Sequence, residues 1–176
     1  YKFAPAHFID EARGWLAEKA PAGDLICGVS GGVDSVTAFK LGLPVYGKRW
    51  NGVYVDNGFM REGETEEVRA LFGDEQMTYI DAREPFYDAL EAIPYLDLGH
   101  TATSEHAYYR KIRDMNAGKF IETFAGAARR LVVPFRALIQ GTNVADIVET
   151  ETDLKAHHHV GPVARRLMEE LNLDVI

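Results

Sequence analysis

The chain has 176 residues, of which 47% are hydrophobic and 26% are charged, and its formal net charge at pH 7 is −8. This composition is typical of a globular domain with an ordinary core. The acidic excess disfavours broad binding to nucleic-acid backbone, which needs clustered lysine and arginine. No apolar run approaches the roughly 18 residues that cross a bilayer, and a single cysteine, Cys27, excludes a disulfide framework. We therefore expect a cytoplasmic protein without membrane or nucleic-acid partners.

Helical and strand patterns alternate along the chain. An amphipathic helix is predicted over residues 3–20, and a short apolar run at 24–29 predicts a strand buried on both faces. The elements predicted next are helix 36–41, strand 52–55, helix 62–72, strand 77–80, helix 84–92, a turn-like segment at 94–104, helix 105–130, strand 135–140 and helix 163–173. This alternation predicts an α/β fold with a doubly wound parallel sheet, as one domain over residues 1–176.

Polar or glycine-rich turns follow three predicted strands, at 30–35, 56–58 and 141–146. Ligands bind beyond the carboxyl ends of parallel strands, so we expect these turns to border one crevice. The richest is Ser30-Gly31-Gly32-Val33-Asp34-Ser35, where adjacent glycines and successive N–H groups favour an anion-binding nest at a helix N-terminus. Asp34 could hold a Mg²⁺ ion beside a phosphate. The alternative is a tight strand-to-helix turn in which Asp34 only caps the helix.

The segment SGGVDS at residues 30–35 resembles the signature of the PP-loop ATP pyrophosphatases, which cleave ATP between its α and β phosphates. Other segments resemble motifs of GMP synthetase: residues 53–58 with Met60-Arg61 and Glu64, Asp81-Ala82, Arg110-Lys111-Ile112 with Phe120-Ile121, Gln140-Gly141-Thr142 with Asp146, Glu149 and Thr150, and Lys155 with His157-His158. The resemblance extends from Phe8 to the region of Leu173, and it is to the ATP-pyrophosphatase domain or subunit of that family.

The resemblance implies the Rossmann-like fold of the adenine nucleotide alpha hydrolases and a ligase that makes GMP in two steps. The xanthine O2 of XMP attacks the α-phosphorus of ATP with release of pyrophosphate, and ammonia then displaces AMP. ATP and Mg²⁺ are the implied cofactors, and XMP and ammonia the implied substrates. A glutamine amidotransferase subunit or domain is the implied partner, and the full-length enzyme is expected to be a homodimer. The family's glutaminase and C-terminal dimerisation domains match no part of this sequence.

The same resemblance implies the site residues. The implied ATP-binding residues are Ser30, Gly31, Gly32, Val33, Asp34, Ser35, Val55, Asp56, Arg110, Gly141 and Thr142. The implied catalytic residues are Asp34, Asp146, Glu149 and Lys155, with Asp34 and Asp146 as Mg²⁺ ligands. The nest would hold the leaving pyrophosphate, residues 53–58 would pack against adenine and ribose, and Lys155 would stabilise charge near the α-phosphate. A segment at about 150–162 is expected to form a lid-like loop over the substrate.

Two other functions stay open on the residues alone. One is a PP-loop ATP pyrophosphatase that acts on another acceptor, a carboxylate or a tRNA base. The other is a nucleotide-binding remnant without turnover. Against tRNA thiolation stand the single cysteine and the lack of a basic stripe. His157-His158-His159 lacks the i, i+4 spacing of a helical metal pair, so we favour a covering loop there. Cys27, Trp15 and Trp50 are predicted to be packing residues.

Overall fold

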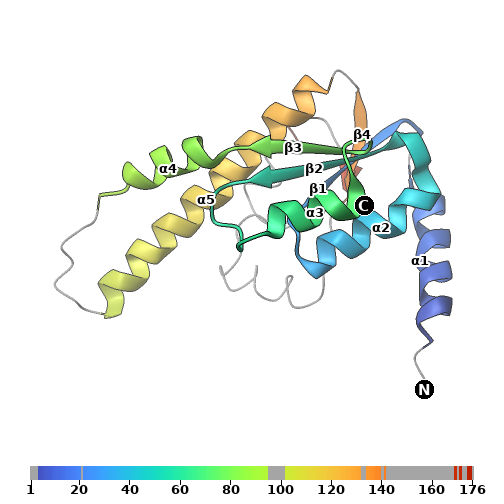
Figure 1. The fold of residues 1–176 in the computed structure, drawn as a ribbon, viewed down its shortest axis with the longest axis horizontal. Coiled ribbons are helices and arrows are strands. Elements are labelled where there is room, and N and C mark those ends of the chain that lie inside the picture. Colours follow the sequence, from blue (N-terminus) through green and yellow to red (C-terminus); the bar gives the residue numbers. More distant parts are fainter. Residues whose placement is uncertain are drawn as a thin grey trace.

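The computed structural model describes residues 4–20, 22–94, 102–131, 134–139, 141, 169, 171 and 174–175. Its elements, in chain order (Figure 1), are α1 (Pro5–Lys19), β1 (Asp24–Val29), α2 (Val33–Tyr46), the short 3-10 helix η1 (Gly47–Arg49), β2 (Trp50–Asp56), α3 (Glu64–Phe72), β3 (Met77–Asp81), α4 (Arg83–Glu91), α5 (Ala102–Arg130), β4 (Phe135–Ile139) and β5 (Asp174–Val175). The strands pair in parallel in the order β3-β2-β1-β4-β5. The chain thus starts in the middle of the sheet and winds outward in both directions, which confirms the predicted doubly wound fold.

Strand β1 is covered on both faces, as its apolar run predicts. Leu25, Cys27 and Val29 belong to a core that they share with residues of α1, α2 and α3. Ile26 points the other way, into a core with residues of α4 and α5. Successive side chains of a strand alternate between faces, so a strand between two helical layers is apolar at almost every position.

Trp50, at the start of β2, anchors the core on the α2 side. Its ring stacks on Phe39 with centroids 5.4 Å apart, and it lies 5.0 Å from the ring of Tyr46. The indole Nε1 donates a hydrogen bond of 2.9 Å to the carbonyl oxygen of Phe39, which satisfies the one polar group of a side chain that is 1% exposed. The predicted packing role of Trp50 is confirmed.

Trp15 does not have the packing role that we predicted for it. Its side chain is 51% exposed, and Leu16 is the residue of α1 that is buried. Helix α1 packs mainly against α2, at the outside of the helical layer, and a helix in contact with one neighbour buries only a narrow stripe. None of the described helices combines the length and apolar character that crossing a bilayer requires.

Several predicted element boundaries shift in the structure. Helix α2 begins inside the glycine-rich turn, at Val33, and continues through Pro44 to Tyr46, beyond the predicted end at Leu41. Residues 102–104, predicted to be turn-like, form the start of α5, which continues through Gly118 and Gly126 without a break. Tertiary packing outweighs the low helix propensity of these two glycines, because Phe124 and Ile121 of α5 lie against the sheet. The two-residue strand β5 was not predicted.

Two helical glycines give opposite expectations for stability. A methyl group at Gly42 in α2 would lie 2.6 Å from the ring of Trp50, whereas one at Gly14 in α1 would meet no atom within 4 Å. We expect Gly42→Ala to lower the free energy of unfolding by about 1–3 kcal/mol through overpacking. The matched control, Gly14→Ala, should raise it by about 0.5–1 kcal/mol because alanine favours helix. Urea unfolding measures both, and an unchanged or raised stability for Gly42→Ala would contradict the packing described here.

Candidate functional site at the carboxyl ends of β1, β2 and β4

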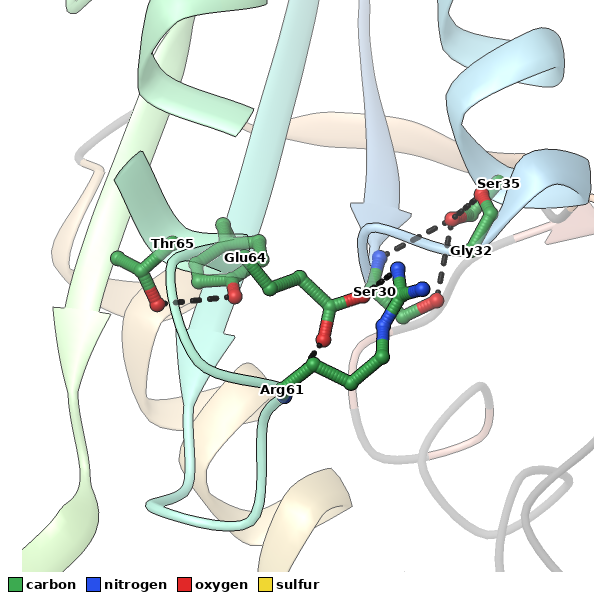
Figure 2. A network of polar contacts seen from close by, with 7 residues as sticks. Ser30, Gly32, Ser35, Arg61, Glu64 and Thr65 are labelled. Carbon is green, nitrogen blue, oxygen red and sulfur yellow. Dashed lines mark hydrogen bonds and ion pairs between the residues drawn. The ribbon is translucent and has the colours of Figure 1, made fainter. Parts of the chain in front are cut away.

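The turn between β1 and α2 is closed by its two serines. Ser35 Oγ accepts a 3.1 Å hydrogen bond from the Ser30 backbone N–H, lies 3.1 Å from Ser30 Oγ and donates to the Gly32 carbonyl oxygen at 3.0 Å (Figure 2). Gly31 has φ +84°, a left-handed conformation that residues with a Cβ rarely adopt. The hydroxyl groups and the second residue of the motif therefore fix the shape of the turn.

The motif ends at an exposed helix N-terminus. Gly32 is the N-cap residue of α2, and the first backbone bond of the helix runs from the Val36 N–H to the Gly32 carbonyl oxygen. The N–H groups of the first turn, Val33 to Ser35, have no partner within a helix and carry the positive end of its dipole. Asp34 lies inside that turn, so the alternative in which Asp34 caps the helix is wrong. A glycine-rich turn that ends at an exposed helix N-terminus is what the predicted anion-binding nest requires.

The ends of β4 and β2 both approach this turn. A methyl group on Gly141 would lie 2.5 Å from the carbonyl oxygen of Asp34 and 2.8 Å from the backbone nitrogen of Ser35. A methyl group on Gly31 would lie 2.8 Å from Oε1 of Glu64, at the start of α3. Segments that follow three different strands thus meet at one place, as expected for neighbouring parallel strands.

The carboxylate of Asp56 holds the turn after β2. Its Oδ1 accepts from the Gly58 N–H at 3.0 Å, and its Oδ2 accepts from the Thr65 hydroxyl at 3.0 Å. The Thr65 hydroxyl also lies 3.1 Å from the hydroxyl of Tyr54, whose pKa is raised by burial. Gly58 has φ +80° and a methyl group there would collide with Tyr87. The predicted Asp56-Asn57-Gly58 turn is confirmed, and both carboxylate oxygens of Asp56 stabilise it.

Glu64 is a charged side chain in a buried position. It is 8% exposed, and its carboxylate accepts from the Arg61 backbone N–H at 3.0 Å and from Arg61 Nη2 at 2.9 Å (Figure 2). The Glu64 backbone N–H donates in return to the Arg61 carbonyl oxygen at 3.0 Å. The hydrogen bond from the Arg61 side chain lowers the pKa of Glu64, against the effect of burial. Glu64 is therefore ionised at neutral pH.

The remaining predicted site residues lie apart from this cluster or outside the described residues. The Val55 side chain is buried in the core, so any contact with a nucleotide would come from its backbone. Arg110 is exposed on the N-terminal half of α5, which extends beyond the arrowheads of β2 and β3 in Figure 1. Residues outside the described ranges are Thr142, Asp146, Glu149, Lys155 and the whole predicted lid segment with His157–His159.

A pocket of about 750 Å³ lies beyond the end of β3, beside this cluster. It is lined by Asp81, Arg83, Glu84, Pro85, Tyr87 and Asp88. Tyr87 connects it to the turn after β2, because its hydroxyl donates to the Gly58 carbonyl oxygen at 3.2 Å. Among the described lining residues, Arg83 already forms an ion pair with Asp81, so this part of the lining offers mainly carboxylates and does not favour an anion. The pocket therefore contributes no predicted site residue.

Sequence reasoning gave no role to three polar residues of this cluster, Arg61, Glu64 and Thr65. Arg61 and Glu64 entered only as part of a resemblance, because an arginine and a glutamate three residues apart are ordinary on a helix surface. The burial of Glu64 against Gly31 depends on how α3 packs beside the turn, which no local pattern indicates.

Within the described residues, no group of three or more His, Cys, Asp or Glu side chains could hold a metal ion.

The sequence is similar to archaeal proteins that are named as one subunit of a glutamine-hydrolyzing GMP synthase. It is 37% identical to that of Methanopyrus kandleri over 99% of this chain and 50% of that protein. It is 35% identical to the Haloarcula marismortui protein over 91% of this chain and 48% of that protein. It is 37% identical to the Thermococcus kodakarensis protein over 97% of this chain and 50% of that protein. The chain thus spans about half the length of these curated relatives. No protein-family model matches it.

The fold is shared with solved structures, two of which are NAD synthetases. An NH3-dependent NAD synthetase from Campylobacter jejuni superposes with a TM-score of 0.62 at 12% identity, over 98% of this chain and 75% of that one. An NAD+ synthetase from Burkholderia pseudomallei gives 0.61 at 18% identity, over 98% and 69%. These superpositions confirm the predicted α/β fold with a doubly wound parallel sheet. The predicted resemblance to GMP synthetase is likewise confirmed over nearly the whole chain.

The buried carboxylate of Glu64 should give stability that depends on pH. Because the folded-state pKa lies below the ordinary value, ionised Glu64 stabilises the fold above that value, and this contribution is lost as the pH falls through the folded pKa. We expect Glu64→Gln to lower the free energy of unfolding by about 1–2 kcal/mol at neutral pH. Urea unfolding at neutral pH and at a pH well below the folded-state pKa measures this, because the difference between the unaltered chain and the Glu64→Gln variant should shrink as the pH falls through that pKa. An equal difference at both pH values would contradict the assigned ion pair.

Cys27 should be inert in the folded protein. Its side chain is fully buried in β1, and burial raises the pKa of the thiol to about 12. A thiolate is needed for nucleophilic attack, so a disulfide reagent should label the folded chain at least about 100-fold more slowly than the urea-unfolded chain. Cys27→Ser provides the blank. Rapid labelling under native conditions would show that β1 is accessible, contrary to the structure.

Proposed function

Because the chain is homologous to about half of a GMP synthase subunit, we propose that it is the ATP-pyrophosphatase part of a GMP synthase, a ligase that binds ATP at the Ser30–Ser35 turn. The observation that carries the proposal is the exposed N-terminus of α2, preceded by a glycine-rich turn and bordered by Gly141. Backbone N–H groups arranged in this way bind phosphate groups. In the proposed reaction the xanthine O2 of XMP forms a bond to the α-phosphorus of ATP, the bond to the β,γ-pyrophosphate breaks, and ammonia then displaces AMP.

The residues of the turn would act by position and charge. The N–H groups of Val33, Asp34 and Ser35 would hold the pyrophosphate oxygens as charge develops on them. The turn after β2, which Asp56 holds, would border adenine and ribose through its backbone. Phosphoryl and adenylyl transfers gain most from such positioning, because little covalent help from the protein is needed.

The Asp34 carboxylate fits a Mg²⁺ site of the kind that forms together with a nucleotide. Asp34 is exposed in the first turn of α2, next to the N–H groups that would face the phosphates. Magnesium in such sites takes one or two carboxylates together with substrate phosphates, so a single carboxylate among the described residues is compatible with it. Bound there, Mg²⁺ would neutralise phosphate charge. On the resemblance alone, Asp146 and Glu149 are proposed to hold Mg²⁺ or to anchor the loop that bears Lys155. Lys155 is proposed, on the same ground, to stabilise charge near the α-phosphate.

The partner and the second substrate are also proposals. We infer a glutamine amidotransferase subunit or domain as the source of ammonia, and a homodimer in the complete enzyme. The chain spans about half of its relatives, so the part that would complete the XMP site need not lie in it. Together, residues 1–176 are proposed to form one ATP-pyrophosphatase domain, with a lid segment near residues 150–162.

The first experiment is pyrophosphate release from Mg-ATP by the whole chain, with and without XMP and ammonium. XMP-dependent release would establish both the reaction type and the acceptor. Release that is independent of XMP would mean that water accepts the adenylyl group in this assay, and XMP would then lose its place as the proposed acceptor to another class, such as a carboxylate. Binding of ATP without release would favour the nucleotide-binding remnant.

Asp34→Asn should remove the proposed metal ligand without changing the size of the side chain. We expect pyrophosphate release to fall by at least about 100-fold, because one preorganised charge at the reacting phosphates is lost. The urea midpoint should stay near that of the unaltered chain, since Asp34 is exposed and is not the N-cap residue. Release at the original rate would remove Asp34 from the mechanism.

A further inference from the structure

A carboxylate lies next to the proposed phosphate site. Oε1 of Glu64 is so near Gly31 that a methyl group there would come within 2.8 Å of it. Glu64 is 8% exposed and ionised at neutral pH, so water screens its charge only weakly. An unbalanced negative charge here would repel the phosphates of ATP. The site therefore needs a cation at this place.

The guanidinium of Arg61 supplies that cation. Its Nη2 donates a 2.9 Å hydrogen bond to Oε1 of Glu64, the same oxygen that faces Gly31. Figure 2 shows the Arg61 side chain extending from the turn after β2 toward Ser30, Gly32 and Ser35. The side chain is 77% exposed, and within the described part of the chain Glu64 is the acceptor that its guanidinium contacts. A guanidinium carries five N–H donors, so several remain for a ligand.

The backbone fixes this arginine before any ligand binds. The Arg61 N–H donates to Glu64 Oε2, and the Glu64 N–H donates to the Arg61 carbonyl oxygen, each at 3.0 Å. Glu64 in turn begins α3, where an acidic side chain is favoured by the helix dipole. A side chain held in place in this way loses little conformational entropy when it binds a ligand.

We propose that Arg61 is a phosphate-binding residue that contacts the β,γ-pyrophosphate part of ATP, and that Glu64 positions it. The inference rests on the proposed function, because it takes the Ser30–Ser35 turn as the ATP site. The planar guanidinium suits paired hydrogen bonds to phosphate oxygens better than a lysine ammonium does. The Glu64 oxygen to which Arg61 donates lies beside Gly31, and Gly31 belongs to the turn assigned to the leaving pyrophosphate, which directs the contact to that part of the nucleotide.

The test compares Arg61→Gln with the charge-matched control Arg69→Gln. Arg69 lies on the same helix as Glu64, where it pairs with Asp74 and stacks 4.2 Å from the ring centroid of Tyr79. Calorimetry of the whole chain measures the dissociation constants of Mg-ATP, inorganic pyrophosphate and AMP. For Arg61→Gln we expect Mg-ATP and pyrophosphate to bind about 10- to 100-fold more weakly, and AMP to bind unchanged. Arg69→Gln should alter none of them.

A second measurement separates positioning from fold stability. Glu64→Gln should weaken Mg-ATP binding when Arg61 is present, and should strengthen it when Arg61 has already been replaced by Gln, because the uncompensated carboxylate is then removed. A role of Glu64 in folding alone would produce the same effect in both backgrounds. Urea midpoints recorded for each variant identify any loss that comes from unfolding.

The outcomes distinguish this inference from the function on which it rests. Suppose that the unaltered chain binds Mg-ATP. If the Arg61→Gln variant binds Mg-ATP equally well, or binds Mg-ATP and AMP more weakly by the same factor, the proposed role of Arg61 is overturned and the ATP site stands. An equal loss in Arg69→Gln would also overturn it, since net charge would then explain the effect. If the unaltered chain binds no Mg-ATP, the proposed function falls and takes the inference with it.

Discussion

The close approach of Gly141 to the backbone of Asp34 and Ser35 is the constraint on which the candidate site depends. Strands β1 and β4 pair side by side, so the segments that leave them must share a small space at the sheet edge. A side chain at residue 141 would push the end of β4 away from α2. Only glycine allows the contact, and the contact keeps the first turn of α2 between two strand ends.

The second constraint is electrostatic. The N-terminus of α2 offers partial positive charge, while Asp34, Asp56 and Glu64 bring carboxylates to the same edge. Asp56 uses both carboxylate oxygens to stabilise its own turn, and Glu64 is paired with Arg61. Asp34 is the exposed carboxylate at the start of α2. The proposed metal–phosphate site takes Asp34 as its carboxylate because Asp34 is exposed in the first turn of α2, beside the N–H groups of the helix N-terminus.

Much of the fold could be predicted because a parallel sheet leaves a strong local signal. Strand β1 has the predicted bounds, and β2 and β3 differ from theirs by at most two residues. Predictions failed where distant contacts decide the outcome. Trp15 is half exposed although it fits an amphipathic pattern. A pattern identifies an apolar stripe, but the neighbour that covers it comes from elsewhere in the chain.

The sequence by itself predicted the doubly wound fold and the turn at Asp56-Asn57-Gly58, because short apolar runs that alternate with amphipathic helices, and the residues of a turn, are local signals. The anion-binding role of the turn at Ser30–Ser35 stays a prediction. The ATP-binding, metal-binding and catalytic roles of all the predicted site residues stay predictions from resemblance. Tertiary structure alone decided that Gly141 lies against Asp34 and that Glu64 lies buried against Gly31 with Arg61 as its counterion. These contacts join segments that follow different strands, and only the pairing of those strands in the sheet brings them together.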